Sequence, residues 1–341
     1  MEILPQIKIK TTKELISYVN NFASTKELFK KDFALHITNK KMPNNLSPAL
    51  INSVKSVKLV ETFENLVMIG GSNVSILNKN GEYILPKISF LDLHEICPES
   101  LDIGGKIINI IKLFEFLASK IKSGQSVFLD FAYPIRPTIN QFGLADGILI
   151  PRSSGAFMRK GHNLEHAKDI KLGEYFGGLI GGHCTVVNDT ITGLLPDFDI
   201  NVIVGTGFNI GYRDGANLVN LESSHFYSQY LPLINNLAGD YDGIGLLVAG
   251  GPQKILSQND NWGIPGIYNC LSENKKVTNA KQVFELAQSQ DILANTILKL
   301  VGLLIESMLD VVAKEIKNEN PKIQYTGSVI KALLEVDYLK L

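Results

Sequence analysis

The stretch from Cys184 to Glu222 holds the segments that decide the fold. It begins Cys184-Thr185-Val186-Val187-Asn188-Asp189-Thr190, continues through Ile200-Asn201-Val202-Ile203-Val204-Gly205-Thr206-Gly207-Phe208-Asn209 and closes Asn220-Leu221-Glu222. Two runs rich in β-branched residues, 184–187 and 200–204, each end in a polar tip, which is the pattern of a buried strand that delivers polar groups to an edge of a sheet. The first tip places the carboxylate of Asp189 between the amide of Asn188 and the hydroxyl of Thr190, and such a carboxylate is suited to take a proton from an alcohol. Glycines that alternate with a threonine suit phosphate, because bare backbone N–H groups can approach an anion closely.

The composition is that of a globular protein with a sizeable core. The chain has 341 residues, of which 45% are hydrophobic and 20% charged, enough for two compact lobes. Its net charge of −1 gives no reason to expect nucleic acid or an anionic membrane as a partner. The three cysteines lack metal-ligand spacing and no signal peptide is evident, so we expect a cytoplasmic protein with free thiols. The apolar stretch 292–313 carries Lys299, Glu306 and Asp310, so we interpret it as a core helix rather than a membrane span.

Both halves of the chain show strands followed by helices. A helical pattern covers 11–40, and apolar runs at 66–69 and 74–77 flank Gly70-Gly71-Ser72-Asn73, which predicts a β-hairpin with a donor-rich tip. A helix over 109–122 and a strand over 127–131 follow. In the second half, strands are predicted at 200–204, 209–212 and 218–221, and helices at 281–290 and 292–317. This repeat predicts two α/β lobes of similar design with a cleft between them.

At these residues the chain resembles the hexokinase family, which has the actin-like ATPase fold. The resemblance runs from about Pro43 to about Ser328, and its main piece is Val186–Thr190 followed by Val204–Asn209 and Asn220–Glu222, whose order and spacing agree with hexokinases. Shorter pieces lie in register around it. They are the phosphate hairpin Gly70-Gly71-Ser72-Asn73, the strand end Phe131-Ala132-Tyr133-Pro134, the sugar-contacting segment Ser153-Ser154-Gly155-Ala156-Phe157, the loop Gly251-Pro252-Gln253 and the nucleotide-site turn Tyr325-Thr326-Gly327-Ser328-Val329.

The resemblance implies an α/β, two-lobed actin-like ATPase (ribonuclease H-like) fold with a central cleft. Residues 1–195 would form a small lobe with the N-terminal helices and the first phosphate hairpin. Residues 196–341 would form a large lobe with the second phosphate turn and the C-terminal helices.

The activity that the resemblance implies is that of an ATP-dependent hexose kinase acting on the 6-hydroxyl of glucose or a similar sugar, with ATP and Mg²⁺ as cofactors. Asp189 would be the general base that takes the proton from the sugar hydroxyl. The residues implied as sugar contacts are Asn188, Asn209, Glu222, Ser153 and Ser154. The residues implied near ATP are Gly70, Gly71, Ser72, Asn73, Thr190, Gly205, Thr206, Gly207, Gly327 and Ser328. No side chain is assigned as a metal ligand, since His162 and His166 are spaced for one helix face but no third ligand is evident.

Several positions depart from the family pattern. Met68 stands where members usually carry the aspartate that orients magnesium, Ser75 stands in place of an arginine and Ala132 in place of a serine. The sugar-contacting lysine falls on Ser154 and the expected glutamate on Leu256. The sequence also stops at residue 341, before the Gly-Ser-Gly-Lys-Gly segment of hexokinases. Phosphoryl transfer depends mostly on positioning and charge neutralisation. Two alternatives therefore stay open: a degenerate hexokinase-like protein that binds sugar or a partner without catalysis, and a kinase for a different acceptor alcohol.

Each motif also has a plainer interpretation. Asp189 and Glu222 would then be exposed carboxylates at strand ends, Gly70-Gly71-Ser72-Asn73 an ordinary hairpin turn, and Ser153 and Ser154 loop serines. Gly205-Thr206-Gly207 is not a dinucleotide fingerprint, because no third glycine falls at the required place. The polar neighbours of Asp189 favour a functional site.

Overall fold

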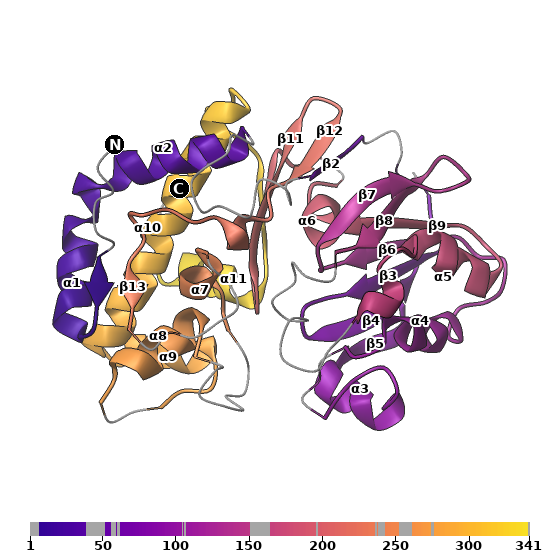
Figure 1. Ribbon diagram of the computed structural model, residues 1–341, viewed down its shortest axis with the longest axis horizontal. Coiled ribbons are helices and arrows are strands. Elements are labelled where there is room, and N and C mark those ends of the chain that lie inside the picture. Colours follow the sequence, from indigo (N-terminus) through magenta and orange to yellow (C-terminus); the bar gives the residue numbers. More distant parts are fainter. Residues whose placement is uncertain are drawn as a thin grey trace. The chain divides into compact units, whose positions relative to one another are not determined.

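The computed structural model describes residues 7–38, 52–55, 59, 62–103, 105, 107–150, 164–195, 197–235, 237, 243–251, 261–273 and 276–339. The chain folds into two compact units (Figure 1). The first unit comprises Met1–Ile51, Pro196–Tyr212 and Leu221–Leu341, and the second comprises Asn52–Leu195 and Arg213–Asn220.

This division differs in two segments from the predicted lobes 1–195 and 196–341. The predicted boundary coincides with one of the points where the chain passes from one unit to the other, between residues 195 and 196. The N-terminal helices, however, group with the C-terminal segments, because α1 (Thr12–Asn21) and α2 (Lys26–Ile37) pack against α10 (Ile292–Glu315). The short segment 213–220 groups with the second unit, where β12 (Asn217–Asn220) pairs with β2 (Asn52–Lys55).

The second unit is built on a five-stranded sheet in the order β5-β4-β3-β6-β9. Its strands are β3 (Asn65–Ile69), β4 (Asn73–Asn78), β5 (Tyr83–Ser89), β6 (Val127–Phe131) and β9 (Cys184–Asn188). β3, β4 and β5 form antiparallel pairs, whereas β6 runs parallel to both β3 and β9. The carboxyl ends of β3, β6 and β9 therefore meet at one edge, where Ile69, Phe131 and Asn188 stand in one row.

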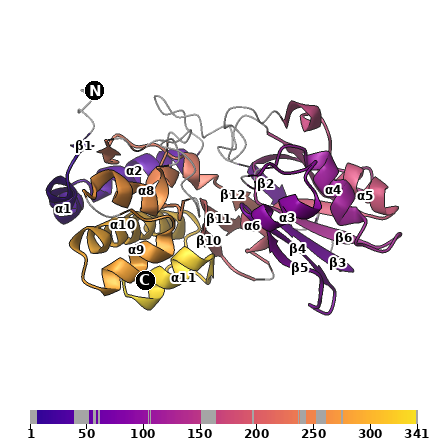
Figure 2. The same ribbon diagram turned by 90° about the horizontal axis from the view of Figure 1, so that it is seen from below.

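The two faces of this sheet carry different layers, because side chains alternate along each strand. Leu129 and Val186 face the larger core, to which α4 (Ile110–Ala118) and α5 (Leu172–Ile180) contribute (Figure 2). Phe128 and Val187 face a smaller cluster that includes Ile191 of α6 (Asp189–Thr192). The other elements of this unit are α3 (Phe90–Ile96), η4 (Leu164–Ala167) and the hairpin of β7 (Ile135–Ile139) and β8 (Ala145–Leu149).

In the first unit, β10 (Ile200–Val204) lies between β14 (Ile323–Thr326) and β11 (Phe208–Asp214), parallel to β14 and antiparallel to β11. The 24-residue helix α10 packs against α1, α2, α8 (Gly263–Leu271) and α9 (Ala280–Gln288), as Figure 1 shows. The remaining elements are η1 (Phe22–Ser24), η5 (Ser223–His225), α7 (Gly245–Val248), α11 (Ser328–Glu335) and the parallel pair β1 (Lys8–Ile9) and β13 (Leu233–Ile234).

Most predicted elements are confirmed. The strands at 127–131 and 200–204 have the predicted bounds. The helices predicted at 109–122, 281–290 and 292–317 correspond to α4, α9 and α10, each of which ends a few residues earlier than predicted. The single helical pattern over 11–40 contains two helices. They are separated at η1, where the hydroxyls of Ser24 and Thr25 donate to the carbonyls of Asn21 and Phe22 and so compete with helical hydrogen bonding.

Two further expectations concern membrane spans and thiols. None of the helices in the described part of the chain is long and apolar enough to cross a membrane. Cys97, Cys184 and Cys270 are free thiols, as expected.

Candidate functional site

Asp189 is the first residue of α6 and directly follows β9. Asn188 caps this helix: its Oδ1 accepts from the Thr190 N–H at 3.0 Å, and its Nδ2 donates to the Phe131 carbonyl at 3.2 Å. These bonds turn the chain from strand to helix and deliver Asp189, half-buried, to the edge where β3, β6 and β9 end. Asn188 itself is only 1% exposed. Its observed contacts therefore position Asp189, and its predicted sugar contact stays a prediction.

A second carboxylate, which the sequence analysis missed, lies beside Asp189. Asp130 of β6 pairs with Met68 of β3 on one side and Val187 of β9 on the other. The Thr192 hydroxyl donates to Asp130 Oδ1 at 2.8 Å. Thr192 stands three residues after Asp189 in α6, so one helical turn brings the two carboxyl groups into the same neighbourhood. The sequence signal was a lone charged residue in the otherwise apolar run of β6.

The two carboxyl groups differ in their affinity for protons. Burial raises the pKa of Asp189 to about 6, although hydrogen bonds from Thr190 act in the opposite direction. Burial also raises the pKa of Asp130, to about 8, and the negative charge of Asp189 raises it further while the Thr192 hydroxyl lowers it. As pH rises, the first proton therefore leaves Asp189. Asp189 is therefore the member of the pair that ionises more readily and can accept a proton.

The predicted phosphate hairpin forms the turn between β3 and β4. The Gly70 N–H donates to the Asn73 carbonyl at 2.9 Å, and Asn73 Nδ2 donates to the Ser72 hydroxyl at 3.4 Å. The Ser72 carbonyl accepts from the Phe90 N–H at 2.9 Å, which ties the turn to the start of α3. Because Gly70 directly follows β3, the turn lies at the same edge of the sheet as Asp189.

The departures Met68 and Ser75 face each other across this hairpin. Ser75 is 2% exposed. A thioether is only a weak acceptor and a hydroxyl carries no charge. Neither side chain therefore supplies the carboxylate or the cation that the hexokinase resemblance leads one to expect there.

In the first unit, the other two predicted nucleotide turns are neighbours. Gly205-Thr206-Gly207 follows β10 and Gly327-Ser328 follows β14, and the two strands are parallel. A Cβ at Gly327, whose φ is 102°, would lie 2.3 Å from the Val204 carbonyl oxygen. The segment around Gly250 joins them, since the Gly250 N–H donates to the Gly205 carbonyl at 2.7 Å. The contribution of Gly250 depends on tertiary contact and left no signal in the sequence.

Neither the backbone conformation nor the neighbouring protein atoms explain why residues 205 and 207 are glycines. A Cβ added to either would meet no atom of the described residues within 4 Å, and neither has a positive φ. At Gly250, by contrast, a Cβ would lie 2.4 Å from the Gly205 carbonyl oxygen. A bare backbone that faces open space permits close approach of an anion. The backbone of the turn 205–207 is therefore accessible to an anion.

Asn209 of β11 lies beside the segment that follows Glu222. Asn209 Oδ1 accepts from the Ser223 N–H at 2.9 Å and from the Ile210 N–H at 2.8 Å. The first bond fixes the backbone of Ser223, the residue after Glu222. Glu222 itself has a left-handed backbone conformation, with φ 49° and ψ 45°. That conformation costs a non-glycine residue about 1–2 kcal/mol, and such strain clusters at functional sites. Glu222 is 6% exposed, so the side chain of this residue is buried in the protein and does not extend into solvent.

The remaining predicted residues, Ser153 and Ser154, lie outside the described residues, as does Leu256. The predicted residues of the second unit, Gly70–Asn73 and Asn188–Thr190, gather at one edge of its sheet. Those of the first unit form two neighbourhoods, the turns at 205–207 and 327–328, and Asn209 with the segment after Glu222.

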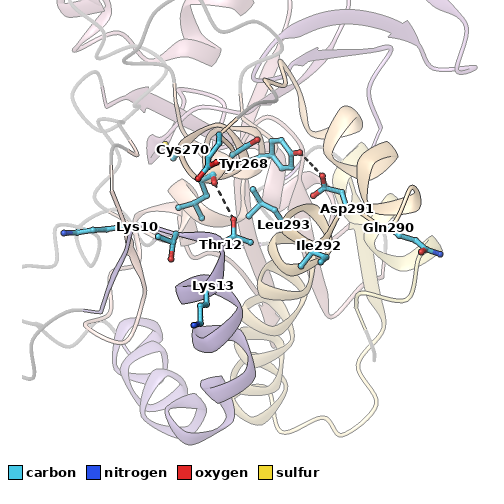
Figure 3. A pocket seen from close by; sticks show the side chains of 13 residues that line it. Lys10, Thr12, Lys13, Tyr268, Cys270, Gln290, Asp291, Ile292 and Leu293 are labelled. Atoms are coloured by element: carbon cyan, nitrogen blue, oxygen red, sulfur yellow. Dashed lines mark hydrogen bonds between the residues drawn. The ribbon is translucent and has the colours of Figure 1, made fainter.

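A separate hollow of about 750 Å³ lies where α1 and α10 begin and α8 ends (Figure 3). Tyr268 donates to Asp291 Oδ2 at 3.0 Å, and Asp291 also caps α10. Lys10 and Lys13 extend away from the Tyr268–Asp291 pair. Of the predicted site residues that the structure describes, none lines this hollow, and both helix starts there are already capped by side chains.

Comparison with known proteins identifies the fold. No model of a known protein family matches the sequence, and no curated protein sequence matches it. The structure resembles that of a hexokinase from Schistosoma mansoni complexed with glucose, with a TM-score of 0.61 and 14% identity over 97% of this chain and 93% of that chain. It also resembles a second hexokinase crystal structure, with a TM-score of 0.53 and 15% identity over 97% of this chain and 92% of that one. The predicted α/β, actin-like fold of hexokinases is thereby confirmed.

Proposed function

We propose that this protein is an ATP-dependent hexose kinase that phosphorylates the 6-hydroxyl of glucose or a similar hexose. The observation that carries the proposal is the placement of Asp189 at the edge where three parallel strands end, as the member of a carboxyl pair that ionises first. A carboxylate with a raised pKa in such a position suits general-base catalysis on an alcohol. The choice of a hexose as acceptor is supported by the hexokinase fold and by the glucose complex of the Schistosoma mansoni protein.

In the proposed reaction, Asp189 accepts the proton of the sugar hydroxyl while the oxygen of that hydroxyl forms a bond to the terminal phosphorus of ATP. The bond between that phosphorus and the bridging oxygen breaks, and the leaving electron pair stays on ADP. Asn209 and Glu222 would bind sugar hydroxyls, together with Ser153 and Ser154, and Asn188 would hold Asp189 in place. The backbone and side chains proposed to approach ATP are those of Gly70–Asn73, Thr190, Gly205–Gly207, Gly327 and Ser328.

The donor would be ATP with Mg²⁺ bound to its own phosphates. Met68 provides no charged ligand, so we derive no step through a protein-bound metal. The uncharged pair Met68 and Ser75 in the first hairpin also supports a second candidate. In this alternative the protein binds sugar without phosphoryl transfer, because the charge of the triphosphate is not balanced there.

The two candidates are separated by measuring both binding and turnover on one sample. Glucose is titrated by calorimetry, and ADP release is followed with ATP, Mg²⁺ and glucose. Release of ADP that depends on glucose and is lost in Asp189→Asn is the result expected of the kinase. Glucose binding without ADP release would favour the non-catalytic candidate, and binding of neither glucose nor ATP would overturn both.

A further inference from the structure

Asp130 belongs to no part of the hexokinase resemblance, yet it lies beside the proposed base. In the cross-strand row of Met68, Asp130 and Val187 it is the titratable member. Its Oδ1 accepts from the Thr192 hydroxyl at 2.8 Å. Asp189 is the first residue of α6 and Thr192 the last. The single turn of α6 therefore carries one carboxyl group and is anchored at its other end by the second.

We propose that Asp130 is a positioning residue for Asp189: its carboxyl holds a proton while Asp189 is ionised, so that the pair carries one negative charge at this edge of the sheet. The proposal rests on the proposed role of Asp189 as the base. The Thr192 hydroxyl occupies Oδ1 of Asp130, which leaves Oδ2 to carry the proton. A second negative charge would oppose the approach of a phosphoryl group, and a neutral Asp130 avoids it.

Among the residues that the structure describes, the elements packed around Asp130 supply no charge that would offset a second carboxylate. β3 contributes Met68, β9 contributes Val187 and α6 contributes Thr192 and Asp189. β12, which packs against α6, consists of the uncharged residues Asn217–Asn220. Arg213 directs its Nη2 to the Leu194 carbonyl at 2.8 Å. The charge that acts on Asp130 is therefore that of Asp189, which raises the pKa of Asp130.

Carboxyl-carbon NMR of aspartate-labelled protein tests the proposal without relying on activity. In the wild type, the carboxyl groups of Asp130 and Asp189 are expected to titrate above the ordinary range of aspartate, with Asp130 the higher of the two. Burial also raises the pKa of Asp32 and Asp146, so the pair is assigned from the signals that are lost in Asp130→Asn and in Asp189→Asn. Asp130→Asn keeps an oxygen for Thr192 and copies the neutral carboxyl, so the higher titration should disappear and the lower one should not move. Asp189→Asn should lower the pKa of Asp130, because it removes the negative charge beside it. Thr192→Val, which removes the bond that lowers the pKa of Asp130, should raise it.

The same variants give distinct pH profiles of glucose-dependent ADP release. The wild-type rate should rise as Asp189 ionises and fall as Asp130 ionises, whereas Asp130→Asn should keep the rise and lose the fall. A merely structural Asp130 would change the rate equally at every pH. Titration of both Asp130 and Asp189 in the ordinary range of aspartate, or an unchanged pH profile in Asp130→Asn, would overturn the proposal. Absence of ADP release in the wild type would refute the proposed function instead, and the NMR titration would still decide whether the pair shares a proton.

Discussion

Alanine substitutions at Gly205 and Gly207 test whether these glycines are needed for ligand binding or for folding. In Gly205→Ala and Gly207→Ala the new methyl group meets no atom within 4 Å in the part of the chain that the structure describes, and the backbone has no positive φ. Loss of glycine at a compatible position stabilises a protein by about 0.4–1 kcal/mol through the unfolded chain. We therefore expect the melting temperature of both variants to stay level or to rise by about 1–3 °C.

The same methyl groups would stand where we propose that a phosphate of ATP approaches the backbone. A hydrogen bond to a charged group contributes about 1.5–3 kcal/mol, and about 1.4 kcal/mol corresponds to a tenfold change in affinity. Displacing one such bond should weaken ATP binding by about 10- to 100-fold. Calorimetric titration of ATP with Mg²⁺ into each variant measures this loss, and glucose binding by the same variants should be unchanged.

Gly250→Ala is the matched control in the neighbouring segment. Its Cβ would lie 2.4 Å from the Gly205 carbonyl oxygen and 2.9 Å from Val329 Cγ2, so the backbone must move and the 2.7 Å hydrogen bond from Gly250 to Gly205 is strained. Overpacking of this kind costs about 1–3 kcal/mol, which lowers the melting temperature by about 3–10 °C. Full ATP affinity in Gly205→Ala and Gly207→Ala would refute the inference that a ligand explains these glycines.

Substitutions at three carboxylates also test the account. Asp189→Asn should lower the rate of glucose-dependent ADP formation by at least about 100-fold while preserving glucose binding; normal turnover would exclude Asp189 as the base. Asp130→Asn should raise the melting temperature at alkaline pH and leave it unchanged in acid. The wild-type contribution of Asp130 to stability is complete below its ordinary pKa of 3.8 and is lost as pH rises through its folded-state pKa of about 8. A thermal shift of equal size at every pH would contradict this. Glu222→Gly should be more stable than Glu222→Ala, because both lack the side chain and glycine relieves about 1–2 kcal/mol of left-handed strain against about 0.5–1 kcal/mol of chain entropy. Both variants should bind glucose about tenfold more weakly or worse; full glucose affinity in both would count against a sugar-binding role.

The strands that carry the predicted site were predictable from hydrophobic pattern alone. β6 and β10 have the bounds that their apolar runs indicate, and β9 ends at the polar tip that begins with Asn188. Buried strands read as continuous β-branched runs, and the chain must leave the sheet where polar residues begin. For the same reason Asp189 and the turn 205–207 were recognisable as candidates before their surroundings were known.

The features that escaped prediction depend on tertiary contacts. The amphipathic faces of α1 and α2 do not reveal which core covers them, and α10, against which they pack, comes more than two hundred residues later in the chain. Asp130 is a single acid in an apolar strand, and only the register with β9 and the bond from Thr192 connect it with Asp189. The left-handed conformation of Glu222 has no local signature, since Asn209 holds the following residue from another strand.

The most direct test of the central claim is the release of ADP by the wild-type protein in the presence of ATP and Mg²⁺, measured with and without glucose or another hexose. A hexose kinase with Asp189 as its base predicts ADP release that requires the hexose and appears in step with the phosphorylated sugar. Saturable glucose binding with no hexose-dependent ADP release, for any hexose tested, would contradict the claim and leave a sugar-binding protein of the hexokinase fold.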